Sequence, residues 1–282
     1  MLRPKFIPAL LGFLPAALWF AASGAPAQTA TQANTQPLPA PVQLSVAQEL
    51  PLNPALPTVF IVGDSTARNQ ADLGWGDHLA HYFDTVRVNV ANRAMAGRSS
   101  RTYIQEGRWD KVLAEMKAGD YVLIQLGHND GGGPRGSLKG LGEETSGIPL
   151  PDGQLETVQT YGWYLRKYIA DTRAKGATPI LLTLTIRNIW TAGADGKQHI
   201  ERDMGYDAAL KQLAADQHVV LADMGKIEAD RLEALGPEKT AAYFPKDHTH
   251  TSAEAAELNA DSVVRALRAA QSPLVAYLAP RP

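Results

Sequence analysis

Short runs of apolar residues recur along this chain, and segments with the spacing of an amphipathic helix separate them. Apolar runs of this length that end at glycine or polar residues are typical of strands buried on both faces. Buried strands that alternate with helices indicate a parallel sheet covered by helices on both sides, so we predict an α/β fold. The predicted strands are residues 59–62, 86–91, 121–126, 180–184 and 218–222.

Two of the predicted helices have clear signals. Apolar side chains at 161, 164, 165, 168 and 169 have the three-and-four spacing that places one apolar stripe on a helix. A second helix is predicted over residues 253–270, because Thr251 and Glu254 stand before it at the spacing of a capping box. In parallel sheets ligands bind beyond the carboxyl ends of the strands, so functional residues are expected directly after the strand runs.

The chain begins with the pattern of a secretory signal peptide. Two basic residues precede a largely apolar stretch over residues 6–22, and Ala25-Pro26-Ala27 has the small-x-small pattern that signal peptidase cuts. A membrane anchor is the alternative, but two prolines interrupt the stretch, which is shorter than the ~20 residues of a spanning helix. We therefore expect cleavage near Gln28 and export to the periplasm or the extracellular space.

The remaining chain divides into a leader and one domain. Residues 28–57 are rich in Gln, Thr, Ala and Pro without a sustained period, which is typical of a flexible leader. We predict a signal peptide over 1–27, the leader over 28–57 and a single domain over 58–282. A chain of 282 residues is long enough for that domain to bury a substantial core.

Composition excludes several classes of function. The formal net charge is only -2, which gives no electrostatic reason to expect nucleic acid or an anionic membrane as a partner. The chain has no cysteine, which rules out disulfides, zinc-thiolate sites and a cysteine nucleophile. We expect a monomer that has no membrane partner after signal cleavage.

Three polar segments follow three of the predicted strands. Ser65 lies in Gly63-Asp64-Ser65-Thr66, where a turn into a helix exposes it beside free N–H groups, although such residues also serve simply as helix caps. Gly97 has no side chain to block a ligand from its backbone N–H, and Asn129 offers a neutral amide donor suited to an oxyanion. Each segment alone also fits an ordinary turn, but their joint position after buried strands favours a site.

Near the C-terminus, Asp247-His248-Thr249-His250 supplies a base and a carboxylate. A serine hydroxyl needs an adjacent base, and an aspartate three residues before a histidine can accept its Nδ1–H while Nε2 faces the serine. His250 fits that role, and His248 is the alternative base. The competing hypothesis is a metal site, formed by Asp247, His248 and His250 with His128 and Asp130, or by His78 and His81 at helical spacing.

Two absent motifs narrow these alternatives. The chain contains no H-E-x-x-H, the motif of helical zinc hydrolases, which weakens the hypothesis of a catalytic metal. It also contains no G-x-S-x-G, so the nucleophile elbow of α/β-hydrolases is not expected.

Taken in order, these segments resemble the blocks of the SGNH (GDSL-like) hydrolases over residues 59–270. Within that superfamily the chain is most similar to the rhamnogalacturonan acetylesterases, through Ala96–Arg101, Tyr161–Tyr164 and Gly176–Pro179 as well as the blocks themselves. The resemblance implies a three-layer α/β/α sandwich with a flavodoxin-like sheet. It also implies an exported serine esterase that removes acetyl groups from plant cell-wall polysaccharides, most of all acetylated rhamnogalacturonan (pectin), without a metal or an organic cofactor.

The resemblance also implies residue roles. Ser65 is the nucleophile, His250 the general base and then acid, and Asp247 its orienting partner. The oxyanion hole comprises the N–H groups of Ser65 and Gly97 and the side chain of Asn129. In one departure from the family pattern, Leu184-Thr185-Ile186-Arg187 stands where a proline-containing turn before the arginine is expected.

Two other functions remain open from the sequence. One is an SGNH esterase that acts on acetyl xylan, another acylated glycan or a lipid, and the other is a non-catalytic carbohydrate-binding protein on the same scaffold. Retention of the whole set of site residues argues against a pure binder. Exposed aromatic side chains such as Trp190 or Tyr243 are candidates for stacking on sugar rings.

Overall fold

A parallel five-stranded sheet forms the centre of the computed structural model, which describes residues 51–131, 134–149 and 153–280. Its strand order is β2-β1-β3-β6-β9, and every neighbouring pair is parallel. Counted along the chain, this is the 2-1-3-4-5 order of flavodoxin-like sheets. The strands are Thr58–Gly63 (β1), Asn89–Asn92 (β2), Tyr121–Gln125 (β3), Thr178–Leu182 (β6) and Val220–Ala222 (β9).

β1 shows why the strand runs are continuously apolar. Successive side chains of a strand point to opposite faces, so both sets need an apolar partner when helices cover both faces. Phe60 and Val62 pack into the hydrophobic core on one face, and Val59 and Ile61 pack into the core on the other. All six residues of β1 are buried.

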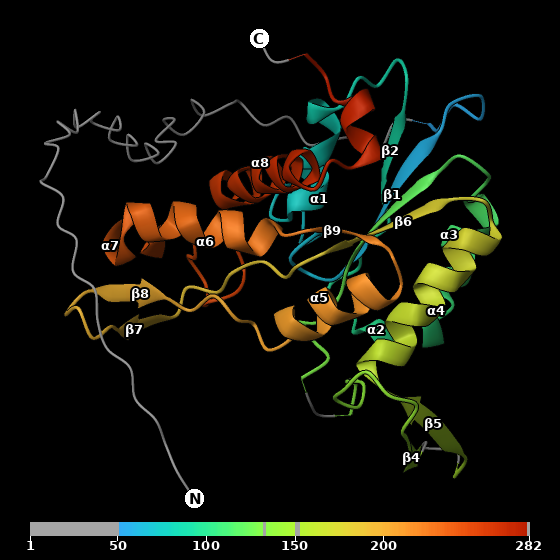
Figure 1. Ribbon diagram of the computed structural model, residues 1–282, viewed down its shortest axis with the longest axis horizontal. Helices are drawn as coiled ribbons and strands as arrows, with labels where there is room; N and C mark the ends of the chain where they lie inside the picture. Colours follow the sequence, from blue (N-terminus) through green and yellow to red (C-terminus); the bar gives the residue numbers. More distant parts are fainter. Residues whose placement is uncertain (1–50, 132–133, 150–152, 281–282) are drawn as a thin grey trace, which may run out of the picture. The chain divides into compact units, whose positions relative to one another are not determined.

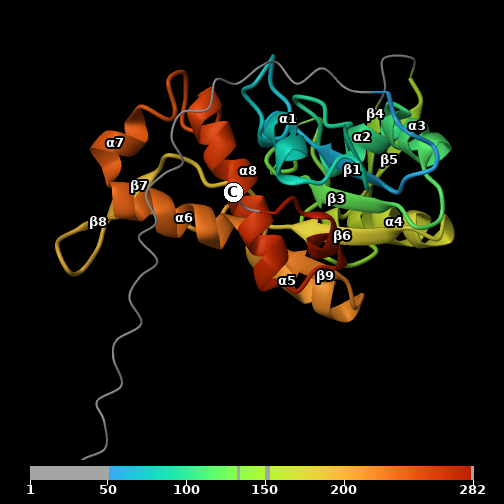
Figure 2. The same cartoon turned by 90° about the horizontal axis from the view of Figure 1, so that it is seen from above.

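Two layers of helices enclose the sheet, as Figures 1 and 2 show. One core contains side chains of α2 (Ser100–Gln105), α3 (Arg108–Glu115), α4 (Tyr161–Ala174) and α5 (Asp207–Asp216). The other contains side chains of α1 (Trp75–His78), η1 (Leu79–Tyr82), α8 (Ala253–Ala269) and η2 (Pro273–Tyr277). A third cluster joins α6 (Met224–Leu235) and the segment after α7 (Pro237–Ala241) to α8. The predicted three-layer α/β/α fold is confirmed.

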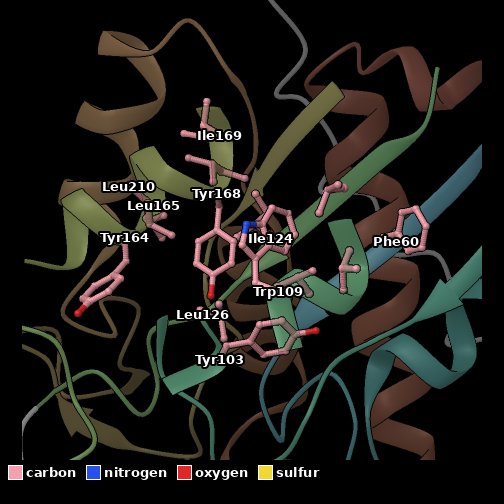
Figure 3. Close-up of a cluster of buried hydrophobic side chains, with 14 of the residues drawn as sticks. Phe60, Tyr103, Trp109, Ile124, Leu126, Tyr164, Leu165, Tyr168, Ile169 and Leu210 are labelled. Atoms are coloured by element: carbon pink, nitrogen blue, oxygen red, sulfur yellow. The ribbon is translucent and has the colours of Figure 1, made fainter. Parts of the chain in front are cut away.

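Aromatic side chains fill the first core (Figure 3). The rings of Trp109 and Tyr168 meet edge to face with centroids 4.8 Å apart, and Tyr103 lies 6.4 Å from Tyr168. Tyr168 comes from the apolar stripe of α4, all of whose predicted residues are buried. Thr160 caps this helix by accepting a hydrogen bond from Trp163 N at 3.1 Å.

The five predicted strands correspond to the five strands of the central sheet, but their ends are shifted. β2 begins at Asn89 instead of residue 86, because Val86 lies in a turn and is 83% exposed. β6 begins at Thr178 and includes Pro179, which pairs with Val122 near the start of the strand, where a missing N–H is tolerated. β9 starts later than predicted, because His218 has a positive φ of 50°.

The start of α8 differs from the predicted capping box. Ser252, not Thr251, is the N-cap, and its side chain accepts from Ala255 N at 3.3 Å. Thr251 instead donates its hydroxyl to Leu73 O at 3.1 Å. The capping prediction was therefore wrong by one residue, because the threonine connects the start of α8 to the loop after β1.

Two small antiparallel hairpins outside the central sheet were not predicted. Thr145–Pro149 (β4) pairs with Leu155–Gln159 (β5), and Trp190–Ala192 (β7) pairs with Gln198–Ile200 (β8). They extend the loops after β3 and β6. Trp190 is partly buried against the third cluster, and Tyr243 is 7% exposed inside it, so the expectation that Tyr243 is an exposed aromatic was wrong.

The predicted signal peptide and residues 28–50 of the leader lie outside the described residues, so the domain boundaries stay a prediction. Residues 51–57 contact the domain. Asn53 N donates to Asn89 Oδ1 at 2.9 Å, and Lys117 Nζ donates to Leu56 O at 2.7 Å. Among the helices described, none has the length and apolar character needed to cross a bilayer.

Glu257 of α8 joins this helix to η1 and α1. Its buried carboxylate accepts from His78 Nδ1 and His81 Nε2, both at 3.0 Å, and from the hydroxyl of Tyr82. Burial alone raises the pKa of Glu257, but these hydrogen bonds outweigh it and lower the pKa to about 2. The other nitrogen of His78 faces the carbonyl of Asp72 at 2.8 Å, so both ring nitrogens face acceptors and the imidazolium form satisfies both.

The Glu257 cluster predicts acid sensitivity of the fold. A carboxyl group whose folded pKa is lowered stabilises the fold above its ordinary pKa of 4.5, and this contribution disappears as the pH falls towards about 2. Glu257→Gln should therefore be less stable than wild type near neutral pH, with a difference that shrinks below pH 4.5. Urea unfolding over a pH series measures this, with Glu238→Gln on α7 as control. A difference that is constant with pH would contradict the assignment.

Candidate active site

The loops that contain Ser65, Gly97 and Asn129 leave the carboxyl ends of three neighbouring strands. β1 lies between β2 and β3, so the loops after these strands meet at one edge of the sheet. The strand order changes direction between β1 and β3, which is where α/β sheets bind ligands. His250 comes from the loop between α7 and α8 and reaches the same edge.

The backbone around Ser65 forms a single helical turn. The amides of Ala67 and Arg68 donate to Asp64 O at 3.2 and 3.0 Å, but no helix follows directly. The prediction of a helix after Ser65 was therefore wrong. Asp64 Oδ1 accepts from both the N–H and the hydroxyl of Thr66 at 2.9 Å, which fixes the turn, and burial raises the pKa of Asp64 to about 6.

Close packing holds this turn against the sheet. A Cβ on Gly63 would lie 2.9 Å from Ala67 Cβ and 3.1 Å from Gln125 O, so the close packing of the turn against β3 requires glycine at this position. Gln125, which the sequence did not single out, accepts at Oε1 from Trp75 Nε1 at 2.7 Å, and the same oxygen lies 3.1 Å from Thr66 Oγ1. Its only sequence signal is a polar residue at the end of an otherwise apolar strand.

Ser65, His250 and Asp247 form one chain of hydrogen bonds. The Oγ of Ser65 lies 2.9 Å from Nε2 of His250, and Nδ1 of His250 lies 2.7 Å from Oδ2 of Asp247. The other oxygen of Asp247 accepts from the backbone N–H groups of Thr249 and His250 at 2.7 and 2.8 Å. Such a relay can transfer the serine proton to the imidazole during nucleophilic attack.

The carboxylate of Asp247 stays ionised in this arrangement. Desolvation raises its pKa, but the hydrogen bonds from the His250 ring and from two backbone amides outweigh it and hold the pKa at about 2. The carboxylate therefore fixes the Nδ1–H tautomer of His250 and leaves Nε2 as an acceptor towards Ser65.

His248, the alternative base, is not part of this chain. Its side chain is exposed, and its backbone carbonyl accepts from Asn188 N at 2.8 Å. The structure thus brings His250, and not His248, to Ser65.

The three predicted oxyanion donors line the same pocket as Ser65 and His250. In the described part of the chain, the N–H groups of Ser65 and Gly97 donate to no other group. Gly97 has a positive φ of 76°, which favours glycine at this position. Asn129 Nδ2 donates one hydrogen to Arg98 O at 3.1 Å, which orients the amide and leaves its second hydrogen.

The pocket is open and has a volume of about 490 Å³, within the range of ligand sites. Asn69 and Gln70, from the loop after the Ser65 turn, form part of its wall, and Lys246 lines it as His250 does. Gln70 and Asp72 have positive φ angles, which prevents the turn at Ser65 from continuing as a helix.

The residues proposed as alternative metal ligands have other partners. His128 Nε2 lies 2.9 Å from Thr185 Oγ1, and Asp130 accepts from both the N–H and the hydroxyl of Ser100. Desolvation and the positive charges of Arg187 and His250 lower the pKa of His128 to about 3, so its ring is neutral. Over the described ranges, no group of three or more His, Asp or Glu side chains is arranged to hold a metal ion.

The loop after β6, where the chain departs from the family pattern, is shaped without a proline. Ile186 N donates to the buried carboxyl of Glu228 at 2.9 Å, and burial raises the pKa of Glu228 to about 8. A Cβ on Gly225 would lie 2.5 Å from Leu184 O, so the glycine at the second position of α6 admits this loop. Arg187 lies at the end of the loop with Nη2 3.4 Å from His128 O.

A flavodoxin-like sheet with a serine–histidine–aspartate relay at its carboxyl edge defines a class of serine hydrolase. The chain belongs to the GDSL-like Lipase/Acylhydrolase family, whose model matches residues 61–275. It is an esterase of the SGNH type, as the sequence blocks predicted.

Similar proteins support this assignment. The rhamnogalacturonan acetylesterase of Emericella nidulans is 36% identical over 215 residues, which cover 74% of this chain and 84% of the relative. The probable rhamnogalacturonan acetylesterase YesY of Bacillus subtilis is 30% identical over 225 residues, which cover 77% and 94%.

Solved structures share the fold. Protein YxiM of Bacillus subtilis matches with a TM-score of 0.63 and 26% identity over 78% of this chain, which spans 58% of that protein. The acetylxylan esterase Axe2 of Geobacillus stearothermophilus matches with a TM-score of 0.50 and 17% identity, covering 75% of this chain and 94% of that one. At that identity Axe2 shows a common fold alone.

The hydrogen bonds predict different effects for the two histidines of the Asp247–His250 loop. His250→Ala removes the base beside Ser65 and should lower kcat by about 10⁴ or more. His248→Ala, a matched control in the same loop, should keep turnover close to wild type. Hydrolysis of 4-nitrophenyl acetate by both purified variants measures this. A large loss in His248→Ala with activity left in His250→Ala would exchange the two assignments.

Proposed function

We propose that the chain removes O-acetyl groups from acetylated rhamnogalacturonan through an acetyl-serine intermediate. The observation that carries this proposal is the relay in which His250 lies 2.9 Å from Ser65 Oγ and 2.7 Å from Asp247. Similarity to two proteins named as rhamnogalacturonan acetylesterases supports the choice of acyl group and polysaccharide.

In the first step Ser65 Oγ attacks the carbonyl carbon of the acetyl ester, and its proton moves to His250 Nε2. Negative charge develops on the carbonyl oxygen, which accepts hydrogen bonds from the N–H groups of Ser65 and Gly97 and from the Asn129 amide. The C–O bond to the sugar then breaks, and the sugar oxygen leaves with the proton from His250. The acetyl group is now bound to Ser65 Oγ as an ester.

In the second step a water molecule takes the place of the sugar alcohol. His250 removes its proton as the water oxygen attacks the acetyl carbon, and the same donors hold the oxyanion. Collapse of this intermediate returns the proton to Ser65 Oγ and releases acetate. Asp247 stays ionised throughout and stabilises the imidazolium that forms in each step.

The openness of the pocket fits a polymeric substrate. Ser65 is reached through a pocket open to solvent, so a sugar unit can enter while the rest of a polysaccharide chain lies outside. The bound part of the substrate is then small, and the acyl group is the part that must fit most closely. Acetylated xylan and other acylated substrates are the alternatives that the experiment below separates.

The oxyanion role of Asn129 predicts a specific loss. Asn129→Ala should keep the fold and lower kcat by about 10²–10³, because one oxyanion donor is removed from the transition state. Steady-state hydrolysis of 4-nitrophenyl acetate, with circular dichroism to verify the fold, measures this. Gln212→Ala, which removes an exposed amide of α5, is the control. Turnover near wild type in Asn129→Ala would contradict the role.

Acetate release tests the substrate. Purified protein and Ser65→Ala are incubated with acetylated rhamnogalacturonan and, in parallel, acetylated xylan, with and without a chelator. We expect acetate from the pectic substrate, no acetate from Ser65→Ala, and no effect of the chelator. Release from xylan alone would keep the mechanism and change the substrate. Binding to either polymer without acetate release would favour a carbohydrate-binding protein.

We also propose that the protein is exported from the cell. A polysaccharide of the plant cell wall lies outside the cell, and residues 1–27 have the pattern of a signal peptide. N-terminal sequencing of the protein recovered from the periplasm and the medium tests this, with a mature terminus near Gln28 expected. Protein found only in the cytoplasm with its first residues intact would contradict it.

A further inference from the structure

A second pocket of about 410 Å³ adjoins the one at Ser65. Its charged lining comprises Arg98, Arg101 and Arg135 together with Glu106 and Glu156. These side chains come from α2 and the residues that flank it at both ends, from the segment after β3 and from the β4–β5 hairpin. The second pocket is therefore assembled from three separate parts of the chain.

The two pockets share a wall. Gly97 lines the pocket of Ser65, and the next residue, Arg98, lines the second pocket. The amide of Asn129, which faces the first pocket, donates to Arg98 O at 3.1 Å. A substrate whose acetyl ester lies at Ser65 can thus place another of its polar groups at the second pocket.

Arg101 supplies a fixed positive charge to this second pocket. It is only 3% exposed, its Nη2 donates to Pro134 O, and its Nη1 lies 3.0 Å from Glu156 Oε2. Its Nε has no hydrogen-bond partner in the part of the chain that the structure describes. A buried guanidinium with an unused donor costs free energy, which a ligand of opposite charge reduces.

The remaining charges of the second pocket do not cancel. Glu106 accepts from Arg98 at 2.8 Å and also from Arg108, outside the pocket, at 2.7 Å. The guanidinium of Arg135 is exposed and has no partner among the described residues. Three arginines face two carboxylates, one of which is shared, so the pocket is positive although the chain has a net charge of -2.

A further unpaired cation lies in the first pocket. Lys246 lines it beside His250 and has no ion-pair partner in the described ranges. An acetyl ester is neutral, and the relay and the oxyanion donors act on it without these cations. Their position on both sides of the shared wall therefore indicates a ligand that is negatively charged beside its ester.

We propose that the second pocket binds a uronic acid carboxylate of the substrate that lies close to the acetyl ester. Guanidinium groups match the planar carboxylate, and Arg98 and Arg135 lie where they can donate to it, while buried Arg101 adds a fixed charge. The inference rests on the proposed function and deepens it, because it explains how an acidic polysaccharide is distinguished from a neutral one such as xylan.

The test compares two forms of one substrate. Acetylated rhamnogalacturonan oligosaccharides are used as such and after methyl esterification of their uronate carboxylates, and acetate release is measured for both. We expect a kcat/KM for wild type about tenfold or more higher on the free carboxylates, and a preference that decreases with salt. Arg135→Gln should reduce this preference by about three- to fivefold, the scale of one exposed ion pair.

Lys139→Gln is the matched control, because it removes the same charge from an exposed side chain of the same segment outside the pocket. The control should keep the wild-type preference. If wild type acts on both forms at the same rate, or if Lys139→Gln loses as much preference as Arg135→Gln, this inference is overturned but the proposed function is not. If wild type hydrolyses 4-nitrophenyl acetate but releases acetate from neither form, the proposed function itself is wrong.

Discussion

The Asx turn at Asp64 is the interaction on which the site depends. One carboxylate oxygen, buried beneath the sheet edge, accepts both donors of Thr66 and so fixes the backbone on either side of Ser65. The turn can pack this close because Gly63 has no side chain and Gln125, beside Thr66, supplies a buried acceptor for Trp75. Serine is thereby held at the end of β1 with its N–H unpaired.

The helix α8 positions the other half of the relay. Ser252 caps the helix, and Thr251 donates to Leu73 O. Glu257, in the first turns of α8, accepts hydrogen bonds from side chains of α1 and η1. The loop that contains His250 is therefore bound at its end to the same segment that forms the wall of the Ser65 pocket. Residues that are 185 positions apart in the chain meet because both of their loops reach the same edge of the sheet.

The sequence predicted the sheet more accurately than the connections, and it singled out side chains that the structure brings together at Ser65. The strands can be recognised in the sequence because a strand buried on both faces is apolar at every position. Asp247 and His250 can be recognised as a pair because they are only three residues apart. The prediction of a helix after Ser65 was wrong because Gln70 and Asp72 adopt positive φ angles, which their residue types alone do not predict.

The β4–β5 and β7–β8 hairpins were missed because they are short and largely exposed, without a strong apolar pattern. Gln125 and Glu228 act through tertiary contacts, which a local pattern does not contain.

Electrostatic interactions explain why His128, a histidine beside the relay, is neither the base nor a metal ligand. His250 becomes an imidazolium during each half of the proposed reaction, and Asp247, whose pKa is held at about 2, is ionised to balance it. A second charge on His128 would oppose that step. Desolvation, together with Arg187 and His250, lowers the pKa of His128 to about 3, so its ring stays neutral and can hydrogen-bond to Thr185. Burial next to fixed cations thus leaves His250 as the histidine whose charge changes at the Ser65 pocket.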